Sequence, residues 1–320
     1  MKLVITGANG SVGRALLRAM FGAHDAPRAG AQQGGSGFEV HALLRSVRSQ
    51  QEMARDFPQV RTHLVGGSHA ESHRVLSGAH AVVHLAWSTV PVSANNDPAL
   101  DQRANLASGL QLLEACGRVG IGRFVFISSG GTVYGAGNGV PHREGDPLDP
   151  IGAYGNGKAC MEHYVRLRSA HHGYASTILR PANLYGSPAS AKKDQGVVEH
   201  WMDLIHLQRP IEVWNGFNVV RDFVHIDDMV HAILATLGPN EQPAVLNVGT
   251  GVGTSLAQLR EMLFAIAGNT VPAIDHGAGV SALPWNVLDP TLSRTALGGG
   301  THVPLQVGLL RSWQSRYPAR

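Results

Sequence analysis

Residues 6–13 read Thr6-Gly7-Ala8-Asn9-Gly10-Ser11-Val12-Gly13 and stand between a short apolar run and a stretch whose apolar residues recur at helical spacing. A glycine-rich turn after a strand and before a helix is the setting of a dinucleotide-binding loop. We expect the first glycine to permit the tight turn, the second to let the backbone approach a pyrophosphate, and the third to allow close contact between helix and strand. The N–H groups at the start of the helix would face the anion. The predicted cofactor-binding residues of this loop are Gly7, Asn9, Gly10, Ser11, Val12 and Gly13. The alternative is a glycine-rich turn without a ligand.

Outward from this loop, short apolar runs alternate with amphipathic stretches. The expected buried strands are Leu3–Ile5, Val40–Leu44, Ala81–Leu85, Phe124–Ile127 and Thr177–Leu179. The expected helices are Val12–Phe21, Leu100–Val119 and Tyr154–His171. Repetition of strand and helix predicts an α/β fold with a doubly wound parallel sheet of the Rossmann type. We expect Gly22–Gly37 to be a long surface loop.

The pattern changes after Arg180-Pro181, where polar, helical and short extended pieces follow one another. These pieces predict a smaller, partly discontinuous C-terminal domain that binds substrate. Two strand-like pieces, Arg221–His225 and Ala244–Val248, could return to the main sheet. The predicted division is therefore 1–181 plus 219–248 for the dinucleotide-binding domain and 182–218 plus 249–320 for the substrate-binding domain.

The composition is that of a packed globular chain. Of 320 residues, 43% are hydrophobic and 15% are charged, which excludes disorder over most of the length. The net charge is only +3 and the arginines are scattered, which disfavours a nucleic-acid partner. The two cysteines cannot form a disulfide framework, and the 17 histidines fall in no metal-ligand spacing, so we expect no metal.

The beginning of the chain runs straight into the glycine loop, without an apolar stretch of secretory length. Elsewhere, no apolar run approaches the roughly 20 residues that span a bilayer. We therefore expect a soluble, cytoplasmic protein with no membrane partner.

The end of the second expected strand bears on the choice between NAD and NADP. An acidic residue there would bind the ribose hydroxyls of NAD. The chain reads Leu43-Leu44-Arg45-Ser46 instead, and the Arg45 guanidinium could pair with a 2′-phosphate. This favours NADP or loose discrimination, while the alternative is that Arg45 is a solvated loop residue.

A tyrosine and a lysine share one face at the start of the last expected helix of the sheet. Tyr154 and Lys158 are four positions apart, so the phenol and the ammonium can lie in one site. The cation would stabilise a phenolate and lower the tyrosine pKa towards that of a general base, and the lysine could also hold the nicotinamide ribose. Upstream, Ile127-Ser128-Ser129-Gly130-Gly131-Thr132-Val133-Tyr134-Gly135 places hydroxyl groups at the carboxyl edge of the sheet.

With these motifs, nearly the whole chain resembles the extended short-chain dehydrogenases/reductases of the NAD-dependent epimerase/dehydratase type, with UDP-galactose 4-epimerase as the best-known member. The resemblance includes His84-Leu85-Ala86, Asn105, Leu179-Arg180-Pro181-Ala182-Asn183-Leu184-Tyr185-Gly186, Val220–Asp228, Asn247–Gly251 and Val287-Leu288-Asp289. The stretch Trp87–Pro91 with Asn95–Pro98 looks like a branch found among bacterial polysaccharide enzymes.

The resemblance implies hydride chemistry on a nucleotide sugar, with bound NAD or NADP taking and returning hydride and Tyr154 taking and returning the proton. It implies that Asn183 and Arg221 hold the substrate diphosphate, Arg221 because a guanidinium pairs well with phosphate. The alternative for Arg221 is a structural ion pair with Asp222. Further implied cofactor-binding residues are Leu85, Ala86, Trp87, Asn105, Ser128, Tyr154, Lys158 and Pro181, and further implied substrate-binding residues are Thr89 and Val197.

The sequence departs from the family pattern at four places. Gly130 stands where the family carries its catalytic Ser or Thr, so Ser129 or Thr132 must serve if a hydroxyl is needed. The acidic residue that contacts adenine after the third strand in the family is replaced around Gly66-Gly67-Ser68, and the acidic residue after the second strand is missing. Finally, Gly279 and Ala282 replace an Arg and an Asp, which removes one cationic clamp on the diphosphate.

Two classes of function follow. The first is an active sugar-nucleotide 4-epimerase of the UDP-hexose type, or a related dehydratase or reductase of the same fold. The second is a non-catalytic or differently specialised member, which binds a dinucleotide as a redox sensor or, as an NADP-dependent reductase or dehydratase, acts on a substrate without a diphosphate. Retention of Tyr154 and Lys158 favours chemistry, because a binding module needs no base. The resemblance also implies a homodimer in which Leu100–Val119 and Tyr154–His171 pair with their copies.

Overall fold

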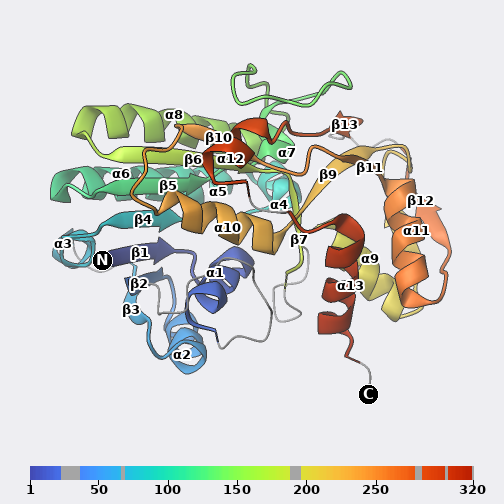
Figure 1. Ribbon diagram of the computed structural model, residues 1–320, viewed down its shortest axis with the longest axis horizontal. Coiled ribbons are helices and arrows are strands. Elements are labelled where there is room, and N and C mark those ends of the chain that lie inside the picture. Colours follow the sequence, from blue (N-terminus) through green and yellow to red (C-terminus); the bar gives the residue numbers. More distant parts are fainter. Residues whose placement is uncertain (23–36, 66–68, 188–195, 278–282, 300–301, 319–320) are drawn as a thin grey trace. The chain divides into compact units, whose positions relative to one another are not determined.

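The computed structural model describes residues 1–22, 37–65, 69–187, 196–277, 283–299 and 302–318 (Figure 1). The predicted loop Gly22–Gly37 lies, except for its two end residues, outside the described residues. The same holds for Gly66-Gly67-Ser68 and for positions 279 and 282.

The main sheet has seven strands in the order β10-β6-β5-β4-β1-β2-β3, flanked by helices (Figure 1). Its strands are β1 (Lys2–Thr6), β2 (Glu39–Leu44), β3 (Arg61–Leu64), β4 (Ala81–His84), β5 (Arg123–Ile127), β6 (Ala175–Pro181) and β10 (Val245–Val248). The ladders from β3 through β2, β1 and β4 to β5 are parallel. This confirms the predicted doubly wound α/β fold.

The apolar runs of the sequence form strands of the main sheet, and their side chains are buried on both faces of the sheet. Leu3, Val4 and Ile5 in β1 and Phe124 in β5 are fully buried. Of the seven strands of the main sheet, β3 alone was not predicted. Its sequence, Arg-Thr-His-Leu, has one apolar residue, and none of its residues is buried, as suits a strand at the edge of the sheet.

The helices of the first half are α1 (Ser11–Phe21), α2 (Val47–Asp56), α3 (His69–Leu76), α4 (Pro91–Asn96), α5 (Pro98–Asp101), α6 (Ser108–Val119), α7 (Gly130–Val133) and α8 (Ala153–His172). The predicted single helix Leu100–Val119 is wrong in detail. A π-helical turn, η1 (Gln102–Ala107), separates α5 from α6. Such a turn admits an extra residue into the helix, and nothing in helical spacing announces it.

Two smaller sheets follow β6. One has the order β11-β9-β13, with β7 also paired to β9, and the other pairs β12 with β8. Their strands are β7 (Asn183–Tyr185), β8 (Ile211–Val213), β9 (Val220–His225), β11 (Gly253–Ser255), β12 (Ala273–Asp275) and β13 (Trp285–Asn286). The expectation that Arg221–His225 returns to the main sheet is therefore wrong, because β11, β13 and β7 occupy the edges of β9. The other strand-like piece, Ala244–Val248, does join the main sheet, as β10.

The remaining helices are α9 (Val197–His206), α10 (Ile226–Thr236), α11 (Leu256–Ala267), α12 (Thr291–Ala296) and α13 (Leu305–Arg316). A hydrophobic cluster centred on Trp201 gathers buried side chains of α9, β8 and α11 and reaches Leu309 of α13. This part of the chain thus has a core of its own.

The chain divides into two compact units. The first comprises Met1–Ser88, Gln102–Ile127 and Cys160–Ile178, and the second Thr89–Asp101, Ser128–Ala159 and Leu179–Arg320.

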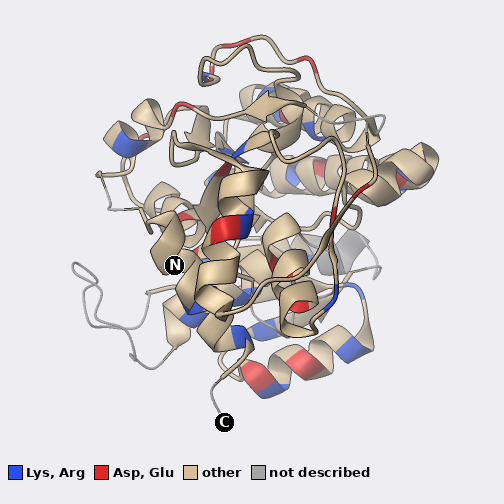
Figure 2. Ribbon diagram, turned by 90° about the vertical axis from the view of Figure 1, so that its right-hand side faces the viewer, with Lys and Arg blue, Asp and Glu red and all other residues tan. Residues whose placement is uncertain are grey.

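Charged residues are spread over the ribbon, with Lys and Arg interspersed among Asp and Glu (Figure 2). Among the helices described, none combines the length and apolar character needed to cross a bilayer. The described histidines, cysteines and carboxylates also form no group of three able to hold a metal ion.

Candidate active site

The glycine loop of the first unit has the shape that a dinucleotide needs. Gly7 has a φ of +70°, and a Cβ atom there would lie 2.6 Å from the backbone nitrogen of Ala86. A Cβ atom on Gly13 would lie 2.6 Å from backbone atoms of Gly7 and Ala8. On Gly10 it would meet, among the described residues, only the carbonyl oxygen of Gly7, at 3.2 Å. The loop is thus closed on its inner side and open beside Gly10, at the start of α1, where a pyrophosphate would bind.

The segment after β4 lies against this loop. The Leu85 N–H donates to the Thr6 carbonyl at 3.1 Å, and the Ala86 N–H donates to Thr6 Oγ1 at 3.3 Å. Buried Asn105 accepts hydrogen bonds at Oδ1 from the Ser88 N–H at 2.7 Å and from the Ser88 hydroxyl at 2.8 Å. The structure therefore brings Leu85 and Ala86 to the glycine loop. Asn105 holds the chain at Ser88, just after this segment, by hydrogen bonds.

Asn9 links the glycine loop to α2. Its Nδ2 donates to Glu52 at 3.0 Å, and its Oδ1 accepts from Arg14 at 3.0 Å. Arg45, at the end of β2, is exposed. An exposed guanidinium at this strand end is compatible with either of the two interpretations of Arg45, as a ligand of a 2′-phosphate or as a solvated residue.

The predicted Tyr–Lys pair is present at the start of α8, in the second unit. Lys158 is buried, and its Nζ lies 5.7 Å from the centre of the Tyr154 ring. Between them, Gly155 permits the helix to dock on α7, because a Cβ atom there would stand 2.5 Å from the carbonyl oxygen of Thr132. The structure thus brings Tyr154 and Lys158 together and places the backbone of Thr132 against the helical turn that carries them.

The expectation that the surroundings of Tyr154 lower its pKa is not met. Burial raises the pKa of Tyr154 above its ordinary value, and the negative charge of Asp101 raises it further. Removal of the phenol from water disfavours the charged phenolate. The surroundings of Tyr154 therefore favour its protonated form, and Tyr154 acts as a base where positive charge or a hydrogen-bond donor stabilises its phenolate.

Gly130 has no room for the side chain that the family carries there. A Cβ atom on Gly130 would lie 2.5 Å from Cδ1 of Leu288, which is fully buried, and 3.1 Å from the carbonyl oxygen of Arg180. Nearby, Ser128 is buried and its N–H donates to the Leu179 carbonyl at 2.8 Å. The hydroxyl candidates remain Ser129, the residue before α7, and Thr132, whose Oγ1 lies 3.4 Å from the Ser129 carbonyl oxygen.

Arg221 and Asp222 are adjacent but do not form the ion pair considered from the sequence. Asp222 is fully buried and accepts from the backbone and hydroxyl of Thr250 and from the N–H of Gly251. Within the described part of the chain, the one hydrogen bond of the Arg221 side chain goes to the Val220 carbonyl at 2.8 Å. Burial lowers the pKa of Arg221 to about 10, and no carboxylate of the described residues offsets this effect. Such a guanidinium is suited to an anionic ligand.

Asn183 lies beside Arg221's strand. Its Nδ2 donates to the Asp222 carbonyl at 3.2 Å, and its carboxamide lies 3.8 Å from the position of a Cβ atom on Gly131. The structure thus places Asn183 between β9 and the loop that carries the hydroxyl candidates. Val197 begins α9 and packs against the cluster around Trp201, and Pro181 ends β6.

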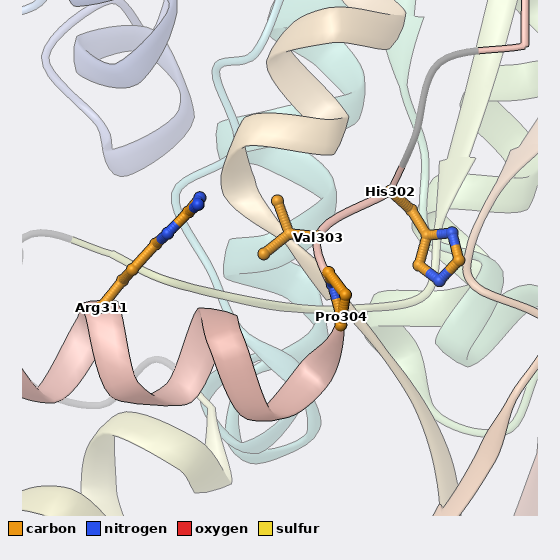
Figure 3. A pocket seen from close by; sticks show the side chains of 4 residues that line it. All are labelled: His302, Val303, Pro304 and Arg311. Carbon is orange, nitrogen blue, oxygen red and sulfur yellow. The ribbon is translucent and has the colours of Figure 1, made fainter. Parts of the chain in front are cut away.

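Sequence reasoning missed two residues near Tyr154. Asn95 accepts a hydrogen bond from the Ala153 N–H at 2.8 Å, and buried Asp101 contributes to the raised pKa of Tyr154. The sequence marked Asn95 only as part of the stretch Asn95–Pro98, and Gly152, with a φ of +91°, allows the close approach to it. A separate hollow of about 450 Å³ is lined by His302, Val303, Pro304 and Arg311 (Figure 3). It contains none of the predicted site residues.

A glycine-rich loop on a doubly wound parallel sheet, with a Tyr–Lys pair on a following helix, defines a dinucleotide-binding enzyme of the extended short-chain dehydrogenase/reductase class. Comparison with known proteins makes the assignment specific. The model of the NAD dependent epimerase/dehydratase family matches residues 3–249, and the chain belongs to this family.

Individual relatives are similar over most of the chain. A UDP-glucose 4-epimerase of Mycolicibacterium smegmatis is 29% identical over 72% of this chain and 74% of its own length. One from Azospirillum brasilense is 34% identical over 63% of this chain and 61% of its own length, so that match spans less than two thirds of the relative.

Solved structures match the fold throughout. The Thermotoga maritima UDP-glucose 4-epimerase with UDP-glucose has a TM-score of 0.84 at 26% identity and 98% coverage of both chains. The Thermus thermophilus UDP-glucose 4-epimerase in complex with NAD has a TM-score of 0.84 at 25% identity and 100% coverage of both.

Proposed function

We propose that this protein is an NAD(P)-dependent UDP-hexose 4-epimerase. The observation that carries the proposal is the Tyr154–Lys158 pair at the start of α8, docked on Thr132 through Gly155. Membership of the epimerase/dehydratase family and the similarity to UDP-glucose 4-epimerases support it. The division of labour proposed from the sequence is 1–181 plus 219–248 for the cofactor and 182–218 plus 249–320 for the substrate, except that β9, which lies outside the main sheet, contributes Arg221 to the substrate.

The residues of the glycine loop fit a dinucleotide, because a Cβ atom at Gly7 or Gly13 would fill its inner side while Gly10 stays open. The loop and the start of α1 would hold the pyrophosphate, and Lys158 would hold the nicotinamide ribose. NAD or NADP supplies hydride acceptance and return at the sugar carbon. Because one fold can host several chemistries, the assignment of hydride chemistry rests on the glycine loop and Lys158 and not on the fold alone.

The proton is handled by Tyr154. The Tyr154 phenolate takes the proton of the sugar 4-hydroxyl as carbon 4 is oxidised to a ketone. When the ketone is reduced from its opposite face, the phenol returns the proton to the 4-oxygen, and the configuration at carbon 4 is inverted. Lys158 stabilises the phenolate, and a hydroxyl from Ser129 or Thr132 orients the reacting oxygen. General acid–base catalysis of this kind contributes roughly 10²- to 10⁴-fold.

The substrate diphosphate is held by Arg221 and Asn183. Arg221 remains a cation at neutral pH, since its pKa of about 10 lies well above that range. No carboxylate among the described residues neutralises it, so a diphosphate is the natural counter-charge.

The proposal is tested by incubating the protein with UDP-glucose and, separately, UDP-N-acetylglucosamine, each with NAD and with NADP. Formation of the 4-epimer supports it. A reduced or dehydrated product, or turnover only of a substrate without UDP, assigns another reaction of the same fold. Cofactor binding without turnover of any substrate indicates a sensor. The mass of any small molecule that copurifies identifies the cofactor and sugar directly.

We also propose a homodimer in which α6 and α8 pair with their copies. Leu167 on α8 is 60% exposed, which leaves apolar surface for a partner. Light scattering at micromolar concentration tests this, and a monomer mass contradicts it.

A further inference from the structure

Helix α2 is bonded to the glycine loop and to α1 through one row of side chains. Arg48, Glu52 and Asp56 are spaced four residues apart on α2 and so share one face of the helix. Glu52 Oε2 accepts a hydrogen bond from Asn9 Nδ2 at 3.0 Å, and Asp56 forms an ion pair with Arg14 of α1. This row therefore holds α2 against α1, and Glu52 bonds to the glycine loop itself.

Glu52 is a charged side chain with fixed partners on both sides. Its Oε1 accepts from Arg48 Nε at 2.9 Å, while Asn9 is itself held because its Oδ1 accepts from Arg14 Nη1 at 3.0 Å. The hydrogen bonds from Asn9 and Arg48 hold the pKa of Glu52 below its ordinary value. The side chain is 32% exposed, and a carboxylate offers about four lone-pair sites, so a ligand can reach Glu52 and donate to it.

The corner between the glycine loop and the end of the second strand is where this class of fold recognises the ribose of a dinucleotide. Here β2 pairs in parallel with β1 as far as Thr6, the last residue of β1, so the two strands end at the same edge of the sheet. Arg45 directly follows β2 and is exposed. Arg45 from the end of β2 and Glu52 with Asn9 from the glycine loop therefore border the same corner.

We propose that Glu52 is a specificity-determining residue of the cofactor site, which opposes Arg45 by disfavouring a 2′-phosphate and by accepting a hydrogen bond from a 2′-hydroxyl. Like charges repel, so a phosphate in this corner is weakened by the carboxylate, whereas a hydroxyl can donate to it. Glu52, seven residues after Arg45, thus supplies from α2 the acid that the end of β2 lacks. The inference rests on the dinucleotide-binding role proposed above.

The decisive variant is Glu52→Gln, which keeps the size of the side chain and an acceptor for Asn9 but removes the charge. Fluorescence titration gives the Kd of NADPH and of NADH. NADPH should bind roughly three- to tenfold more tightly to the variant, as expected when one nearby repulsive charge is lost, and NADH equally or more weakly.

The matched control is Asp56→Asn, which removes a negative charge from the same face of α2, one turn further along the helix. Its ratio of the two Kd values should stay close to that of the unmodified protein. An unchanged ratio in Glu52→Gln, or the same change in both variants, overturns the proposal.

Glu52→Gln also releases Arg48, a second cation for the phosphate, so the titrations are repeated in chains that carry Arg48→Ala. The shift towards NADPH should persist there, and its disappearance would assign the effect to Arg48 and overturn the role of Glu52.

The titrations do not depend on turnover. If the ratio shifts while no UDP-sugar is turned over, the proposed epimerase function fails and the role of Glu52 stands. If UDP-glucose is epimerised and the ratio does not shift, the inference alone fails. Binding of neither dinucleotide overturns both.

Discussion

The carbonyl oxygen of Thr132 lies so close to Gly155 that a Cβ atom on residue 155 would stand 2.5 Å from it. This approach joins two motifs that are separate in the sequence, the hydroxyl-rich loop after β5 and the Tyr–Lys helix. Any side chain at position 155 would push α8 away from α7, because the blocking atom belongs to the backbone and cannot swing aside. The glycine between Tyr154 and Lys158 therefore sets the distance between the proposed base and the hydroxyl candidates.

Replacement of Tyr154 by Phe should abolish turnover while leaving the fold and cofactor binding nearly intact. The ring keeps its packing, and only the proton carrier is lost, which costs about a hundredfold to ten-thousandfold in rate. Initial rates on the true substrate, with circular dichroism and cofactor titration as controls, check this. A wild-type rate in the variant would make Tyr154 structural.

Replacement of Arg221 by Ala should weaken UDP binding roughly tenfold or more, since a charge-assisted hydrogen bond contributes about 1.5–3 kcal/mol. Because the family's second cationic clamp is absent from the sequence at Gly279, we expect weak but measurable UDP affinity in the unmodified protein. Calorimetry with UDP, GDP and dTDP measures the affinity of the unmodified protein and its loss in Arg221→Ala.

Arg143, whose side chain is 75% exposed in an ion pair with Asp289, provides the control as Arg143→Ala. The diphosphate assignment is lost if no nucleotide binds at millimolar concentration and Arg221→Ala changes nothing. A substrate without a diphosphate then takes its place. Restoring Arg at position 279 should tighten UDP.

The unmodified protein should bind NADP at least as well as NAD. Arg45 stands exposed at the end of β2, where a carboxylate would favour NAD. Arg45→Ala should weaken NADP roughly tenfold and leave NAD unchanged, because only NADP carries the 2′-phosphate. Arg48→Ala is the matched control, since that neighbouring guanidinium already pairs with Glu52 at 2.9 Å. Fluorescence titration of both cofactors decides, and a clear preference for NAD in the unmodified protein contradicts the prediction.

The sequence was sufficient for features that depend on local pattern. Continuous apolar runs such as Leu3–Ile5 predicted buried strands, and the four-residue spacing of Tyr154 and Lys158 predicted a shared helix face, which the structure confirms. Features that depend on distant contacts were out of reach. The hydrogen bond from Ala153 to Asn95 and the raised pKa of Tyr154 arise from packing between segments far apart in the chain, and helical spacing did not indicate the π-helical turn after Asp101. Arg221 lies between these cases. Its residue type predicted a partner for a phosphate, but only the structure shows that its guanidinium does not pair with Asp222.

Gly130→Ser should destabilise the protein, although it restores the residue type that the family carries. The new Cβ atom would stand 2.5 Å from Cδ1 of fully buried Leu288, and overpacking of this kind costs about 1–3 kcal/mol. Leu288→Ala alone leaves a cavity and costs about 2–5 kcal/mol. Because the serine would partly fill that cavity, the double variant should lose less free energy of unfolding than the sum of the two single losses. Denaturant unfolding of all four chains measures this coupling, which we expect to exceed about 0.5 kcal/mol for residues in contact. Strict additivity would mean that Leu288 does not occupy the place of the missing side chain.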